Sequence, residues 1–299
     1  PISAVSGALS GTGTAGAGGN VTVSDRALLA NGTVSITTGA TAGNIAFSST
    51  LDSEANEANT LGLTAGTGNI TFTGAVGSGT NQELGAVMIV RAANVTASST
   101  FEAASLTQTD GTGTTMLDGV LTTTAAAGVN LNTATIDIDA SVVTNGGDVD
   151  LNASVLVDLA TGTSITTTGN TAGDAGGDID IDVSGAGTVN LVGSLFTSGA
   201  DNATDDGGTG GAVTIDTDDG VIGVTAITSD GGDATADNDD GGAAGAITLN
   251  TTGTIITLNG PISAVSGALS GTGTAGAGGN VTVSDRALLA NGTVSITTG

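Results

Sequence analysis

The chain has 299 residues, of which 29 are acidic and only three are basic, so its formal net charge is −26 at neutral pH. It has no Cys and no His, and its only aromatic residues are four Phe. These counts exclude most acid–base, nucleophilic and transition-metal chemistry. The charge also disfavours nucleic acid and anionic membranes as partners. The sequence has no apolar run long enough for a membrane-spanning helix, so we expect no membrane insertion.

The first residues of the sequence are repeated at its end. Pro1–Gly39 recurs without a change as Pro261–Gly299. We therefore read residues 1–260 as one full repeat unit and 261–299 as the start of the next. We predict that residues 1–299 form one continuous β-solenoid, and that any export signal lies outside this sequence.

A second, shorter pattern recurs inside the repeat: Gly or Ala, one spacer, then alternating apolar and polar residues. Its starting positions, in chain order, are Gly19, Gly43, Gly68, Ala93, Ala127, Gly147, Gly177, Gly211, Gly245 and Gly279. Alternation over five or six residues rich in Val, Ile and Thr predicts a strand with one buried face. One or two further short strands follow in most coils. A single coil cannot bury its apolar face alone, so neighbouring coils must stack.

The predicted fold class is all-β, a right-handed parallel β-helix with about nine coils per 260-residue unit, or roughly 43 Å at the usual strand spacing. A β-sandwich would also explain strands at this spacing. A sandwich, however, needs non-equivalent strands and usually a core aromatic residue. Here the same strand returns once per coil, and the length changes fall mainly in one connecting loop, which favours the solenoid.

One recurring pattern resembles a known family. An apolar residue followed by Ser or Thr and then Gly leads through a Gly/Asp/Ala-rich loop to the next alternating strand. It stands at Ile165–Gly169 leading to Asp178–Asp182, and at Ile227–Gly231 leading to Gly245–Leu249. This resembles the repeats of filamentous haemagglutinin-like giant bacterial surface adhesins, most clearly from about residue 127 onward. The resemblance implies a three-faced right-handed helix, secretion and a role in adhesion, and it supplies no catalytic residue.

Acidic residues are the remaining side chains that could form a binding site, and 20 of the 29 lie between Asp137 and Asp240. On strands, alternation places them outward, and equivalent positions of adjoining coils stack about 4.8 Å apart. A bridging Ca²⁺ would relieve the repulsion, whereas interspersed Asn and Thr would leave a hydrated polar face. The loops 199–210 and 230–244 are richer still and are either weak Ca²⁺ sites or flexible solvated segments. The candidate calcium ligands are Asp150, Asp180, Asp182, Asp205, Asp206, Asp237 and Asp239.

These features together predict a structural, non-enzymatic protein. Paired carboxylates occur in glycosidases, but no aromatic or basic cleft is available here to hold a sugar. We expect a stiff stalk or filament building block of a secreted or cell-surface bacterial fibre or giant adhesin. Its expected partner is itself, end to end or as tandem units, with the long loops forming an acidic fin. The alternative is an adhesive region whose acidic loops bind carbohydrate or a receptor on a host or neighbouring cell, with or without calcium.

Overall fold

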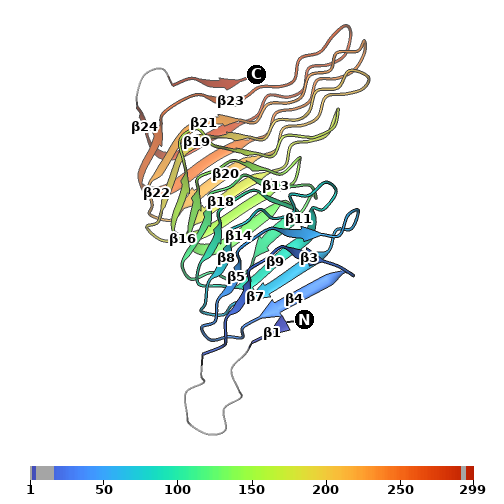
Figure 1. Cartoon of the computed structure of the whole chain (residues 1–299). Coiled ribbons are helices and arrows are strands. Elements are labelled where there is room, and N and C mark those ends of the chain that lie inside the picture. Colours follow the sequence, from blue (N-terminus) through green and yellow to red (C-terminus); the bar gives the residue numbers. More distant parts are fainter. Residues whose placement is uncertain (1, 5–16, 291–293) are drawn as a thin grey trace. The chain divides into compact units, whose positions relative to one another are not determined.

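The computed structural model (Figure 1) describes residues 2–4, 17–290 and 294–299. The parts of the predicted first and last coils that lie at 1, 5–16 and 291–293 are outside these residues. All regular structure in the described part is β-strand, so it has no helix long and apolar enough to cross a membrane. The chain divides into two compact units, residues 1–123 with 130–140 and residues 124–129 with 141–299.

The first unit is a stack of parallel strands in three series, each of which returns once per coil. The first series is β2 (Val21–Val23), β5 (Ile45–Phe47), β8 (Ile70–Phe72), β10 (Val95–Ala97), β12 (Thr114–Leu117) and the later part of β14 (Val129–Ile138). The second is β3 (Ala27–Leu29), β6 (Leu51–Ser53), the start of β11 (Phe101–Gln108) and β13 (Leu121–Thr123). The third is β1 (Ile2–Ser3), β4 (Thr33–Thr37), β7 (Thr60–Thr64), β9 (Leu84–Arg91) and the rest of β11.

Alternation decides which side chains fill this unit. Ile45, Ile70 and Val95 are register partners in successive coils and are almost fully buried. Two residues further along these strands, the rings of Phe47 and Phe72 stack with centroids 5.4 Å apart. Aromatic ring pairs of this kind add to the stability gained from burial. The few aromatic residues of the chain are therefore used mainly in this core.

One coil of this unit was not predicted from the sequence pattern. The 34-residue step predicted between Ala93 and Ala127 is wrong, because Val95 pairs with Thr115 and Thr115 pairs with Ile136. The strand Thr114–Leu117 has Thr at an inward position that elsewhere carries Val or Ile. Thr115 is nevertheless buried, and its hydroxyl donates to Gln108 Oε1 at 2.5 Å. A buried polar side chain is tolerated where it has such a partner.

The second unit repeats the three-series arrangement with longer coils. The first series is the start of β16 (Val149–Leu159), β18 (Ile179–Val183), β20 (Val213–Thr217), and the starts of β22 (Ile247–Leu258) and β24 (Val281–Leu289). The second is the ends of β16, β22 and β24 with the starts of β19 (Thr188–Phe196) and β21 (Ile222–Thr228). The third is β15 (Val142–Val143), β17 (Ser164–Thr166), the ends of β19 and β21, β23 (Ile262–Ala264) and β25 (Ile296–Thr298).

Buried hydroxyls close corners of successive coils in the second unit. The side chain of Thr167 donates to the carbonyl of Gly177 at 2.5 Å, and Thr197 donates to Gly211 at 2.8 Å. Both threonines are fully buried. In the first unit, Thr38 makes the equivalent bond to Gly43 at 2.7 Å. In these coils the Gly that opens the sequence pattern is therefore the acceptor of a corner hydrogen bond.

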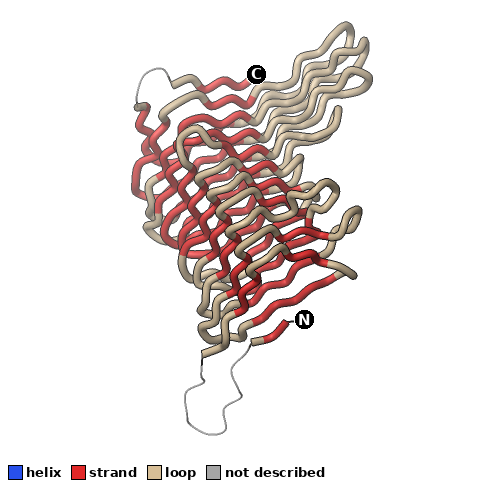
Figure 2. The backbone as a smooth tube through the Cα atoms, viewed as in Figure 1, coloured by secondary structure: helices blue, strands red, loops and turns tan. Residues whose placement is uncertain are grey.

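The fold class predicted from the sequence is confirmed as an all-β parallel β-helix, seen as stacked parallel strands in each unit (Figure 2). The duplicated sequence makes the same pairing in both units. Ile2 pairs with Ile36 in the first copy, and Ile262 pairs with Ile296 in the second. The described residues at the beginning and end of the duplicated sequence therefore form the same strand pair in both copies.

Candidate functional site

The outward face of β16, β18 and β20 carries the strand aspartates predicted as ligands. Asp150 and Asp180 are direct partners on adjacent strands, so the structure places these two side by side. Asp182 lies on the same face, between Asn152 of the preceding strand and Asp216 of the following one. The Asp150 column then continues with an uncharged residue, because Thr214 follows Asp180.

This face is electrostatically unfavourable for a further negative charge. The pKa of Asp180 is raised above its ordinary value by partial burial, and then by the charges of Asp150, Asp182, Asp216 and Asp178. Burial and like charges both penalise the ionised carboxylate. A proton or a cation would relieve the repulsion, and so would replacement of one carboxylate by an amide.

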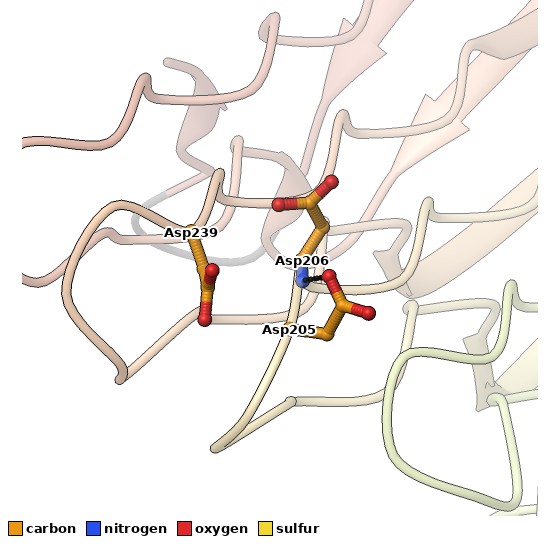
Figure 3. Close-up of side chains that lie close together, drawn as sticks. All are labelled: Asp205, Asp206 and Asp239. Carbon is orange, nitrogen blue, oxygen red and sulfur yellow. Dashed lines mark hydrogen bonds between the residues drawn. The ribbon is translucent and has the colours of Figure 1, made fainter.

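A closer group of carboxylates lies in the loops. Oxygen atoms of Asp205, Asp206 and Asp239 all fall within 4.8 Å of one another (Figure 3). The first two come from the loop 199–210 and the third from the loop 230–244. Asp205 and Asp206 are exposed and Asp239 is half-buried. Hard cations such as Ca²⁺ take several oxygen ligands at about 2.3–2.6 Å, so this trio is the best-assembled candidate among the described residues.

Asp237, the remaining candidate, is used differently. It forms an isolated parallel bridge with Ser270 of the following loop. It is not a member of the trio. Of the four loop aspartates proposed from the sequence, the structure thus assembles three.

Many aspartates of this unit, including Asp206 of the trio, hold adjacent coils together. A side-chain oxygen of each accepts the backbone N–H of a residue in the next coil. In the loops, Asp206 accepts from Asp240 at 2.8 Å, and Asp240 accepts from Thr274 at 2.6 Å. The hydrogen bonds from the backbone and side chain of Thr274 lower the pKa of Asp240. On the strand side, Asp148 accepts from Asp178 at 2.9 Å, and Asp178 accepts from Ala212 at 2.7 Å.

Asparagine forms the same ladder in the first unit. Asn20 accepts from the N–H of Asn44 at 2.8 Å, Asn44 from Asn69 at 2.9 Å, and Asn69 from Asn94 at 3.2 Å. Asn94 in turn accepts from Thr114 at 2.8 Å. Asn and Asp are interchangeable here, because both offer a side-chain oxygen. The sequence pattern contains this ladder at the position between the opening Gly or Ala and the first apolar residue of each strand. That position was interpreted from the sequence only as a spacer.

The long loops of the second unit are bonded to each other in register. Gly199 donates to the carbonyl of Asp230, and Gly231 donates to that of Val265, each at 2.9 Å. The returning limbs pair likewise, with Gly207 donating to Asp240 at 2.9 Å. Figure 2 shows these loops running side by side beyond the strands. Successive long loops of this unit therefore form one hydrogen-bonded layer.

The two limbs of successive loops are also joined across the layer. Gly208 donates to Ala200 at 2.9 Å, Gly232 donates to Gly208 at 2.8 Å, and Gly242 donates to Gly232 at 2.9 Å. This approach requires glycine: a Cβ on Gly208 would lie 1.9 Å from the carbonyl oxygen of Asp174. The glycine content of the loops thus serves close packing, and aspartates such as Asp205 and Asp206 lie exposed on the resulting hydrogen-bonded layer.

Comparisons with protein-family models, with curated proteins and with solved structures found no match to this chain.

Proposed function

We propose that the chain is a structural repeat of an extracellular bacterial surface fibre or giant adhesin, in which it acts as a stiff spacer. The observation that carries this proposal is that the duplicated sequence makes the same strand pair in both units, Ile2 with Ile36 and Ile262 with Ile296. A strand pair that recurs after 260 residues lets repeats follow one another without a new kind of core.

The mode of stabilisation supports this role. Strand pairs, corner hydroxyls and side-chain ladders all connect a coil to its immediate neighbours. Stability in such a stack grows with each added coil, and no single long-range contact holds the fold. The high negative charge keeps a long array soluble and opposes its lateral association.

Imaging tests the proposal. Chains of one, two and three 260-residue repeats, examined by negative-stain electron microscopy, should be unbranched thin rods. Their length should rise linearly by roughly 40–50 Å per repeat, since coils are spaced by about 4.8 Å. Globular beads joined by flexible links, or a length that does not grow with repeat number, would refute a stiff spacer.

A second candidate function is ligand binding by the acidic loops, favoured by the carboxylate trio of Asp205, Asp206 and Asp239. It would be supported by saturable, calcium-dependent binding of the 299-residue chain on a glycan array. The matched control is the Asp239→Asn variant, which should lose that binding. Absence of saturable binding would leave the spacer as the better account, and binding that persists in Asp239→Asn would place the ligand away from the trio.

A further inference from the structure

The strand β9 of the first unit is apolar on both of its faces. Val87 and Ile89 point inward and are almost fully buried, whereas Ala86, Met88 and Val90 point outward and are exposed. Met88 is 48% exposed. A strand with one buried face normally carries polar residues on its other face, so packing of the core does not account for the outward side chains of β9.

The neighbouring strands leave the thioether of Met88 uncovered on one side. β9 lies between β7 and β11 (Figure 1), and the register partners of Met88 on these strands are Gly62 and Thr107. Gly62 has no side chain to lie over the sulfur. The nearest atom to a Cβ added at Gly62 would be the hydroxyl oxygen of Ser35 at 3.2 Å, at the end of a side chain that can turn away. The backbone packing therefore does not require glycine here.

The thioether is the most easily oxidised kind of group in this sequence. The chain has no Cys, Trp, Tyr or His, and it has two Met, Met88 and Met116. Two-electron oxidants convert a thioether to a sulfoxide, which turns a flexible apolar side chain into a polar one. The oxidant must reach the sulfur atom, so the exposure of each Met in the fold decides how fast it reacts.

Met116 provides a comparison inside the same unit. It also points outward, from β12, but it is half-buried. Its register partners are Thr96 and Asp137, which both carry a side chain on the same face. An oxidant therefore has less access to Met116 than to Met88, which has glycine on one side.

We propose that Met88 is a reversible oxidation site for peroxides and related two-electron oxidants. With hydrogen peroxide, the sulfur lone pair attacks one oxygen, and the S–O bond forms as the O–O bond breaks. The hydroxide that leaves takes up the remaining proton of the transferred oxygen and becomes water. Sulfur is oxidised and the peroxide is reduced. Methionine sulfoxide reductases, with a thiol as the electron donor, restore the thioether.

Oxidation at this position changes the surface of the coil and leaves its core in place. The sulfoxide lies at the centre of the outward row formed by Ala86, Met88 and Val90, and it makes this row polar. Val87 and Ile89 keep their inward packing. The oxidation state of Met88 thus sets whether the outward face of β9 is apolar or polar, independently of the spacer role.

Peroxide kinetics on the folded 299-residue chain test the site. The chain is treated with hydrogen peroxide and digested, and peptide mass spectrometry follows the addition of one oxygen atom at each Met. Met88 should be oxidised several-fold faster than Met116, with an unchanged circular dichroism spectrum. The two rates should become equal in urea. Equal rates in the folded chain, a faster Met116, or a difference that persists in urea would overturn the proposal.

Gly62→Leu tests the cause of the accessibility. The added side chain should lie beside the thioether and slow the oxidation of Met88 without changing that of Met116. Gly223→Leu is the matched control, because it adds the same side chain to an outward position of β21 in the second unit, and it should change neither rate. Oxidation of Met88 at the original rate in a folded Gly62→Leu chain would contradict the proposed role of the glycine.

Reversibility has its own measurement. Incubation of the oxidised, folded chain with methionine sulfoxide reductases for both sulfoxide epimers and a thiol donor should remove the added oxygen from Met88. A sulfoxide that these enzymes reduce only after the chain is unfolded in urea and diluted would refute a reversible site. None of these outcomes bears on rod formation, so the spacer function stands or falls separately.

Discussion

Gly211, the corner glycine that precedes β20, offers the sharpest test of how the coils are held together. Gly211 is buried, and a Cβ at this position would lie 2.1 Å from the carbonyl oxygen of Gly177 in the preceding coil. Its own carbonyl accepts hydrogen bonds from Thr197 at 2.8 Å and Ser229 at 2.6 Å. Gly211→Ala should therefore push two coils apart and weaken both bonds.

The magnitude follows from these contacts. Overpacking a filled site typically costs about 1–3 kcal/mol, and each weakened hydrogen bond adds up to about 1 kcal/mol. We expect Gly211→Ala to lower the free energy of unfolding by about 2–4 kcal/mol. Gly223 is the matched control, because the nearest atom to its added Cβ is 3.8 Å away. Gly223→Ala should be neutral or stabilise by up to about 1 kcal/mol, because alanine reduces the conformational freedom of the unfolded chain.

Urea unfolding of the 299-residue chain, followed by far-ultraviolet circular dichroism, measures both variants. Repeat structures can unfold in segments, so hydrogen exchange of the coils around Gly211 should accompany it. Equal midpoints for Gly211→Ala and Gly223→Ala, or unchanged protection near Gly211, would refute the close-packing argument.

Three further predictions concern the polar surface. Asp180→Asn should raise the melting temperature at neutral pH, because it removes repulsion worth roughly 0.2–1 kcal/mol for facing like charges. Since the folded-state pKa of Asp180 is raised, its protonated form favours folding at acid pH and that stability is lost as pH rises through the folded pKa. The gain from Asp180→Asn should thus shrink toward acid pH, below the folded pKa of Asp180. Asn69→Leu should cost about 1 kcal/mol by leaving the N–H of Asn94 without its acceptor, whereas Asn69→Asp should retain most of the stability; urea unfolding compares the two. Calcium at millimolar concentration, typical of weak extracellular sites, should raise the melting temperature, and Asp239→Asn should remove that rise.

Each of these has a defined contrary result. A pH-independent effect of Asp180→Asn would mean that charge is not the cause. Equal losses from Asn69→Leu and Asn69→Asp would show that the side-chain oxygen does not act as an acceptor for the next coil. A calcium effect that persists in Asp239→Asn would place the ion elsewhere on the acidic surface.

Local structure in this protein follows from the sequence alone. Alternating residues such as Ile179, Ile181 and Val183 point inward in turn, and all three are buried as predicted. Alternation is a property of the strand backbone, so it can be read from a few neighbouring residues. The repetition of Gly followed by such strands was enough to predict a parallel β-helix.

The pairings between coils, by contrast, arise only in the tertiary structure. Thr115 lies in a strand that lacks the apolar signature, and it is held inside because Gln108 of another strand accepts its hydroxyl. The trio that includes Asp205 and Asp239 likewise joins residues of different loops. Register between coils depends on contacts among residues 20–34 positions apart. No local pattern contains those contacts, because each exists only once the neighbouring coil is in place.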